Sequence, residues 1–123
     1  MRTLNSSSNI GKLAQEAVND LKAIWRSTLT PDATVQTLAT DLAAIEAAGK
    51  GKPKAASFSV ISDNTTDIVV RYTQEGTDPV ATTTGDPLYD RDKQEIVEYY
   101  NLQRFKFTEE ANNTTTIEVT YYK

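Results

Sequence analysis

The sequence lacks both cysteine and histidine among its 123 residues. Without cysteine no disulfide bond can form and thiol catalysis is excluded, whereas the cellular compartment stays open. Without histidine the chain lacks the commonest general base, proton shuttle and metal ligand. The net charge of −4 argues against a nucleic-acid-binding protein, which needs a concentrated basic face. These absences favour a non-catalytic protein without a nucleic-acid partner.

A long hydrophobic run is also missing, since no stretch approaches the roughly 18–20 residues of a membrane span. The first eight residues, M-R-T-L-N-S-S-S, have no apolar core, so we expect neither a secretory signal nor a membrane partner. A chain of this length can bury roughly two thirds of its unfolded surface as one domain. We therefore expect a single domain over residues 1–123, in which residues 1–8 form a flexible arm.

Residues 9–49 have the pattern of a helical hairpin. The first helix is expected over 9–27, where apolar residues recur at i, i+3, i+4 and i+7. The second is expected from the Thr30-Pro31-Asp32 start signal to about Ala48, with Gly49 as its stop. The short connection favours antiparallel packing within one chain, and bundling of one helix between chains is the alternative.

The remainder, residues 56–123, has strand and turn signals after a linker at 50–55. We expect strands at 56–62 and 67–74, a long exposed loop at 75–88 and a short helical turn at 89–95. Residues 95–123 have the pattern of a closing β-hairpin, in which Phe105 and Phe107 lie across from the alternating Ile117, Val119 and Tyr121. The expected fold class is α+β, an N-terminal helical hairpin followed by a four-stranded antiparallel sheet.

The first arm of this hairpin contains a conflict in its alternation. Ile96 and Leu102 share one parity with Tyr100, while Phe105 and Phe107 share the other. A regular strand cannot place both sets on one face. We therefore predict a β-bulge or a strand break between Asn101 and Arg104.

Acidic residues cluster at Asp86, Asp90, Asp92 and Glu95. A calcium loop counted from Asp90 would need glycine and glutamate at the places that Glu95 and Asn101 occupy, so that motif is absent. A solvated turn is the favoured interpretation. A hard cation with oxygen ligands is the one ligand worth considering, and we expect no metal, cofactor-binding or catalytic residues.

Three lysines, Lys50, Lys52 and Lys54, follow the second predicted helix. They do not form a phosphate loop, because that motif needs glycine at Glu46 and a hydroxyl residue at Pro53. Complementing the helix dipole is their simplest role, with a weak anion or nucleic-acid contact as the alternative.

Serines and tyrosines are the remaining candidates for chemistry. The serines at 6–8 have no base partner, and no S-x-x-K spacing occurs. Tyrosines late in the chain suit sheet faces and interfaces better than ligand stacking: Tyr89, Tyr99, Tyr100, Tyr121 and Tyr122.

The ending L-x-R-F-K-F … T-I-E-V-T-Y-Y-K, from Leu102 to Lys123, resembles the closing hairpin of many small virion proteins of tailed bacteriophages. The resemblance covers the last quarter of the chain and departs at Asn112-Asn113, where glycine or serine is common. It implies a non-catalytic head-decoration, fibre or tail accessory subunit, assembled in the host cytoplasm into a virion. Its implied partners are capsid or tail subunits and further copies of itself. No site residue carries over.

Three functions are compared, of which a nucleic-acid-associated factor acting through Lys50–Lys54 is the least favoured because the chain has an acidic net charge. The favoured hypothesis is a structural or assembly subunit of a virus particle, which acts through protein–protein contacts. The alternative is a small-molecule-binding or enzymatic α+β domain, whose pocket Phe58, Tyr72, Tyr100 and Phe105 would line. In that alternative Asp90, Asp92 or Glu95 would be the acid or base.

Overall fold

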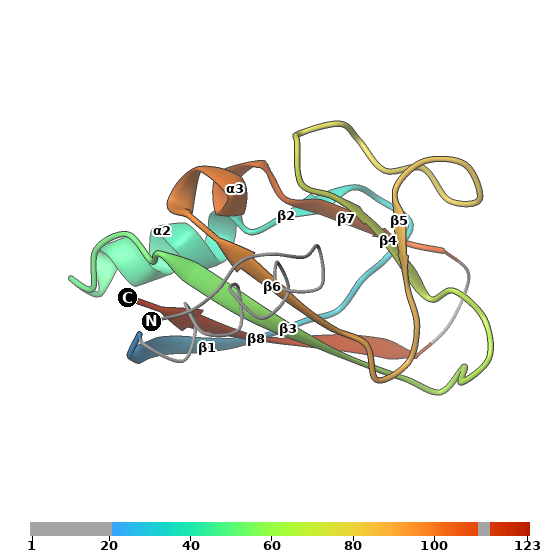
Figure 1. Cartoon of the computed structure of the whole chain (residues 1–123), viewed down its shortest axis with the longest axis horizontal. Coiled ribbons are helices and arrows are strands. Elements are labelled where there is room, and N and C mark those ends of the chain that lie inside the picture. Colours follow the sequence, from blue (N-terminus) through green and yellow to red (C-terminus); the bar gives the residue numbers. More distant parts are fainter. Residues whose placement is uncertain (1–20, 111–113) are drawn as a thin grey trace, which may run out of the picture.

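The computed structural model describes residues 21–110 and 114–123, which form two antiparallel sheets packed face to face (Figure 1). Each sheet has four strands. The first sheet has the strand order β1 (Ala23–Leu29), β8 (Thr115–Tyr122), β3 (Ala55–Ser62), β6 (Lys93–Val97). The second sheet has the order β2 (Gln36–Thr37), β7 (Lys106–Glu109), β4 (Val70–Thr73), β5 (Asp86–Leu88).

The core lies between the two sheets. Strand β8 is central in the first sheet, and its Ile117, Val119 and Tyr121 point inward, as their alternation predicts. Phe105 lies at the middle of the core, where its ring stacks on Phe58 of the first sheet at a centroid distance of 4.8 Å. Burial of these alternating side chains from both sheets is the main source of stability in such a sandwich.

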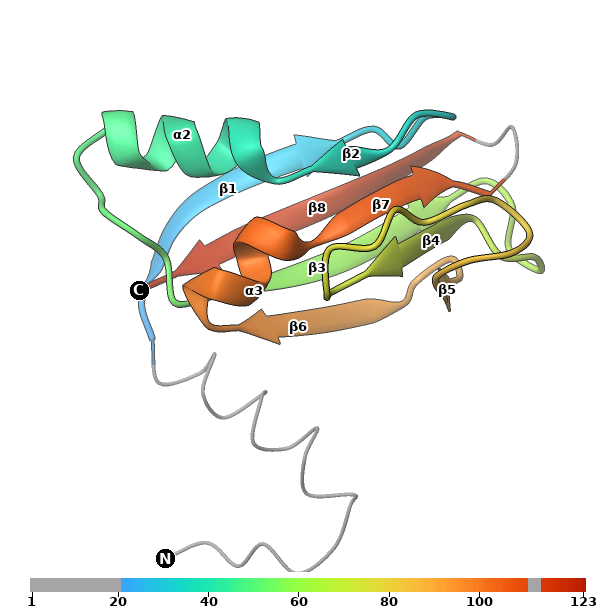
Figure 2. The same ribbon diagram turned by 90° about the horizontal axis from the view of Figure 1, so that it is seen from above.

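Two helices lie on the side of the second sheet, α2 (Ala39–Ala47) and α3 (Tyr99–Arg104) (Figures 1 and 2). Helix α2 buries Leu42 and Ile45 in the core, and Leu38, the residue before its first turn, is buried beside them. Within the described residues, no helix is long and apolar enough to cross a bilayer.

The expected α+β fold with an N-terminal helical hairpin is wrong, because the described chain is mostly strand. Residues 23–27, expected as the end of the first helix, lie instead in β1, in which Trp25 and Leu29 alternate with exposed Arg26 and Thr28. The apolar residues of this stretch fit both the period of a helix and the period of a strand, and pairing with β8 makes it a strand. Residues 9–20 of that expected helix, and the arm at 1–8, lie outside the described residues.

The second helix begins about eight residues later than its predicted start. The Thr30-Pro31-Asp32 signal forms a turn, in which the Asp32 carboxylate accepts a hydrogen bond from the Thr34 amide at 2.8 Å. The chain then passes through β2, and the helix begins only at Ala39. A cap and a proline mark a chain reversal as well as a helix start, so the signal was ambiguous.

The closing hairpin is also wrong. Its two arms, β7 and β8, belong to different sheets and are not hydrogen-bonded to each other. Phe107 and Val119 still belong to one hydrophobic core, but they enter it from opposite sheets.

The predicted strand break is confirmed. Between β6 and β7 the chain forms α3, which begins after Glu98 at a left-handed φ of 77° and carries the chain from the first sheet to the second. The helical turn expected at 89–95 is wrong, since β6 begins at Lys93. The strand expected at 56–62 is confirmed as β3, and that at 67–74 as the shorter β4.

Both ends of the described fold meet at one corner. The amide of Lys22 donates to the Lys123 carbonyl at 3.1 Å, and the Lys123 amide donates to the Lys22 carbonyl at 2.9 Å. This pair continues the β1–β8 ladder by one step.

Candidate functional site

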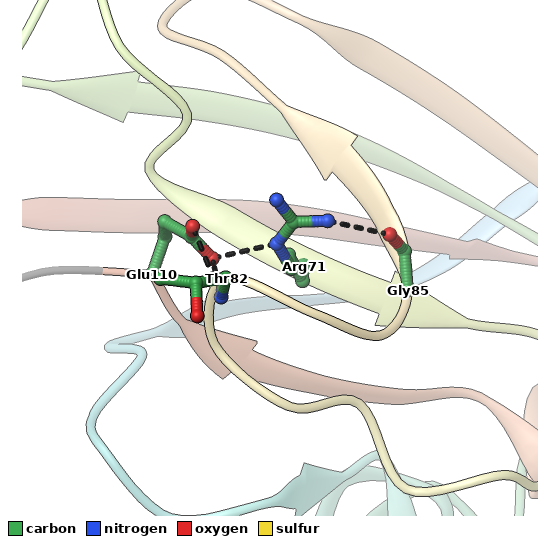
Figure 3. Close-up of polar contacts among 4 residues, drawn as sticks. All are labelled: Arg71, Thr82, Gly85 and Glu110. Carbon is green, nitrogen blue, oxygen red and sulfur yellow. Dashed lines mark hydrogen bonds and ion pairs between the residues drawn. The ribbon is translucent and has the colours of Figure 1, made fainter.

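The outer face of the second sheet is covered by the chain's own loop at 75–85. Arg71 points outward from β4, because its neighbours Val70 and Tyr72 point into the core. Its Nε lies 2.7 Å from Oε2 of Glu110, and its Nη1 donates to the Gly85 carbonyl at 3.1 Å. The same carboxylate accepts a hydrogen bond from the Thr82 amide (Figure 3). One ion pair thus holds the loop at two points.

Further contacts fasten this loop along its length. Lys106 pairs with Asp78 at 2.7 Å, and the Thr73 hydroxyl donates to the Thr77 carbonyl. Thr73 faces outward from the second sheet and is nevertheless buried. Thr108 is buried as well, but its hydroxyl donates to the Asp32 carbonyl at 3.3 Å and not to this loop. The loop at 75–88 is exposed at most of its positions, as predicted, but these contacts fasten its 75–85 part to the sheet, and its end joins the sheet as β5.

The ion pair also sets the charge state of Glu110. Burial alone would raise the pKa of this carboxyl. The hydrogen bonds from Arg71 and from the Thr82 amide, together with the Arg71 charge, outweigh burial and hold that pKa below its ordinary value. The carboxylate is consequently charged at neutral pH.

Within residues 21–110 and 114–123 nothing covers the outer face of the first sheet, and we call it the open face. Its side chains line a hollow of about 470 Å³. The floor is rich in hydroxyl groups. Three of the four charged side chains lie on the edge strands β1 and β6, and the fourth, Glu118, lies on the central strand β8. The members of the open face are Arg26, Thr28, Ser57, Ser59, Lys93, Glu95, Glu118, Thr120 and Tyr122.

The strand register orders this face into two rows. Directly paired positions across β1, β8, β3 and β6 give a first row of Arg26, Thr120, Ser57 and Glu95. The next row along the strands contains Thr28, Glu118, Ser59 and Lys93. Each row therefore carries one cation and one carboxylate.

These four charges have no ion-pair partner in the part of the chain that the structure describes. Among the residues that the structure describes, none of Arg26, Glu118, Lys93 and Glu95 lies within ion-pair distance of an opposite charge. Arg26 and Glu95 stand on opposite edges, three strand spacings or roughly 14 Å apart. The face therefore presents charges of both signs and hydroxyl groups to whatever contacts it.

Comparisons with protein-family models, with curated proteins and with solved structures find no match to this chain. The open face is consequently interpreted from its own residues.

The predicted acidic cluster is dispersed. Asp90 accepts a hydrogen bond from the Ser62 amide and Asp92 one from the Tyr89 amide, each at 2.8 Å. Asp86 lies in β5, whereas Glu95 belongs to the open face. No group of three or more acidic side chains that could hold a metal ion occurs within residues 21–110 and 114–123.

Three of the four aromatic residues of the alternative pocket, Phe58, Tyr72 and Phe105, fill the core. Phe58 and Tyr72 both stack on Phe105, so their rings enclose one another and leave no cavity between them. Tyr100 lies elsewhere, 61% exposed on α3, with the Arg104 guanidinium 5.0 Å from its ring centroid. The described residues therefore contain no pocket lined by this set.

The lysine segment after α2 is joined to neighbouring strands. The Lys54 amide donates to the Tyr122 carbonyl at 2.8 Å, and Lys52 Nζ lies 5.5 Å from the Tyr99 ring centroid. Helix α2 has no basic residue in its last turn, so the expected dipole contact is not made there. The serines at 6–8 lie outside the described residues.

Sequence reasoning missed a buried polar group at Asp41. This side chain, 8% exposed, accepts hydrogen bonds from Ser27 at 2.9 Å and from the Tyr121 hydroxyl at 2.7 Å. Burial, followed by this hydrogen bond and the Asp41 charge, raises the pKa of Tyr121 above its ordinary value. The sequence signal that could have revealed this group is an acidic residue on the apolar helix face formed by Leu38, Leu42 and Ile45. Since the group joins α2 to the first sheet inside the protein, we assign it a structural role.

Proposed function

We propose that this chain is a non-catalytic assembly subunit that acts through protein–protein contacts made by the open face. The observation that carries the proposal is the asymmetry of the two outer faces. The second sheet is covered by residues 75–85, whereas the first sheet carries four charges that no described residue neutralises.

Such a face suits recognition of another polar surface. Complementary charges steer encounters and exclude wrong partners more than they add affinity, and exposed charges cost little to desolvate in part. Hydroxyl groups can donate and accept, so the floor tolerates either type of partner group and ordered water.

The setting proposed for this subunit is the virion of a tailed bacteriophage, with capsid or tail subunits as partners. Its support is the sequence resemblance over residues 102–123. The two arms of that resemblance form β7 and β8 in separate sheets, so it applies to the sequence and not to a hairpin. The small-molecule alternative loses support, because three of the four aromatic residues proposed to line its pocket are packed in the core.

The test is incorporation into particles of the phage that encodes the chain. Gradient-purified particles should contain the chain at a fixed ratio to the major capsid protein, measured by mass spectrometry. A variant with Arg26→Glu and Lys93→Glu should be depleted from particles, whereas Lys50→Glu, a reversal away from the open face, should be retained. Absence of the native chain from particles would overturn the virion setting. Equal incorporation of all variants would overturn the role of the open face.

A further inference from the structure

We propose that the open face binds the open face of a second copy of this chain. This inference rests on the proposed function in using the same surface, and it names the partner. The carrying observation is that Glu95 faces a cation of the second copy, and no like charges face each other, under both ways of stacking two such sheets with aligned strands.

The first arrangement has its two-fold axis parallel to the strands. This rotation reverses the strand order and keeps positions along the strands, so β1 lies opposite β6 and β8 opposite β3 of the second copy. Arg26 then lies opposite Glu95, and Thr120 opposite Ser57, each twice. Glu118 lies opposite Ser59 and is one strand away from Lys93 of the second copy.

The second arrangement has its axis across the strands, between the two rows. Each strand then lies opposite its own copy, and the rows exchange places. Glu95 now lies opposite Lys93, Arg26 opposite Thr28, and Glu118 opposite Thr120. In neither arrangement do like charges oppose one another, and in both a cation of the second copy lies opposite Glu95.

The size of the face sets the expected affinity. Four strands at about 4.8 Å spacing and about five residues of 3.3 Å rise give roughly 300–400 Å² per copy. A total below about 1,000 Å² belongs to weak, transient contacts. The long side chains on the edge strands would meet first, leaving the hydroxyl floor bridged by water. We therefore expect reversible pairing that strengthens when copies are held close together, and that weakens as salt screens the charges.

The experiment is analytical ultracentrifugation of the full chain at low salt over a wide concentration range. The native chain should show a reversible dimer. Glu95→Arg should weaken it about tenfold or more, because it places like charges opposite in both arrangements. Matched reversals on or beside α2, Glu46→Arg and Lys50→Glu, should leave the dimer unchanged.

Mixing two defective variants gives the decisive measurement. Arg26→Glu mixed with Glu95→Arg restores both opposite-charge pairs if the axis is parallel to the strands. Lys93→Glu mixed with Glu95→Arg restores them if the axis crosses the strands. One of the two mixtures should recover a heterodimer to within about threefold of the native affinity, which is less than 1 kcal/mol.

Three results would overturn this inference: a native chain that is monomeric throughout, a dimer indifferent to Glu95→Arg, or failure of both mixtures to pair. Unchanged thermal melts of the variants would show that each is folded. The particle experiment is independent, because a monomer can still be incorporated through other partners, and a dimer can form from a chain that enters no virion.

Discussion

Asp41 is the residue on which the attachment of α2 depends. A buried carboxylate is costly unless its oxygens are hydrogen-bonded, and here two hydroxyl groups, from Ser27 and Tyr121, donate to it. Its place in the first turn of α2 adds the favourable end of the helix dipole. Removing the acceptor leaves the Tyr121 hydroxyl buried without a partner.

We predict that Asp41→Ala lowers the free energy of unfolding by about 2–4 kcal/mol, and that Ser27→Ala lowers it by about 1 kcal/mol. The difference arises because Ser27→Ala removes a single donor and leaves the Tyr121 bond to Asp41 intact. Urea denaturation followed by circular dichroism measures both values. Equal effects of the two substitutions would contradict this account of Asp41.

The raised pKa of Tyr121 predicts sensitivity to alkali. An unfolded tyrosine ionises near pH 10, whereas the folded Tyr121 resists ionisation. Its contribution to stability is therefore complete below about pH 10 and is lost progressively as the pH rises above that value. The loss of stability between pH 8 and pH 11 should be smaller in Tyr121→Phe than in the native chain. Tyr100→Phe, at an exposed position, should leave that pH dependence as in the native chain, and urea midpoints at several pH values report it.

Among the elements, the loop at 75–85 depends on one side chain of β4. Arg71 holds Gly85 directly and positions Glu110, which in turn accepts from Thr82. Gly85 has a φ of 114°, and a Cβ there would lie 3.0 Å from the Tyr72 carbonyl, so the backbone can approach the sheet only with glycine at this position.

We predict that Arg71→Ala releases this loop while the sheets remain folded. Limited proteolysis should then cut within residues 76–84 at least several-fold faster than in the native chain, since the released backbone becomes accessible. Lys106→Ala, which removes the more exposed pair with Asp78, should change the cutting rate little. Comparable rates for Arg71→Ala and the native chain would show that the Glu110 pair is not what holds the loop.

The local sequence pattern was sufficient to predict an element where the neighbouring strands favour the same structure. The alternation in β3 and β8 identified their inward residues, and the parity conflict between Ile96 and Phe105 predicted the break that α3 fills. It failed at Ala23–Leu29 because the apolar residues there fit both a helix stripe and a strand, and only β8 decides between them. It failed for β7 and β8 because facing apolar sides fit a hairpin and two opposed sheets equally well.

The whole molecule is held together by a core that joins the two sheets through Phe105. This ring stacks on Phe58 and Tyr72 and touches Phe107, so each sheet packs against it. The expected cost of Phe105→Ala is about 3–5 kcal/mol, a large fraction of the roughly 5–15 kcal/mol that stabilises a domain.

We accordingly predict cooperative loss of both sheets in Phe105→Ala, at a urea midpoint well below that of the native chain. Tyr100→Ala removes a ring of the adjacent helix that is mostly exposed, and should shift stability by about 0.5 kcal/mol or less. Far-ultraviolet circular dichroism along the urea series measures this loss of strand. A midpoint for Phe105→Ala equal to that of Tyr100→Ala would contradict the central place of this ring.

The open face is a property of the whole molecule and could not be predicted from local sequence. Arg26, Thr120, Ser57 and Glu95 come from four separate parts of the chain, and their order follows only from the register of four strands. Within the sequence they are ordinary polar residues of alternating strands. The sequence alternation predicts only that Glu118 and Thr120 lie on the outward face of their strand.

The corner at which Lys22 and Lys123 are hydrogen-bonded has a mechanical consequence. Tension between these two positions would peel β1 from β8 one rung at a time, because each rung bears the load alone. Tension between Thr30 and Lys123 would instead strain the rungs of that ladder together, since the two points lie at its opposite ends. In optical tweezers, handles at Lys22→Cys and Lys123→Cys should open the protein at a much lower force than handles at Thr30→Cys and Lys123→Cys, and equal rupture forces would refute this. The mechanical strength of the protein therefore depends on the direction in which it is pulled.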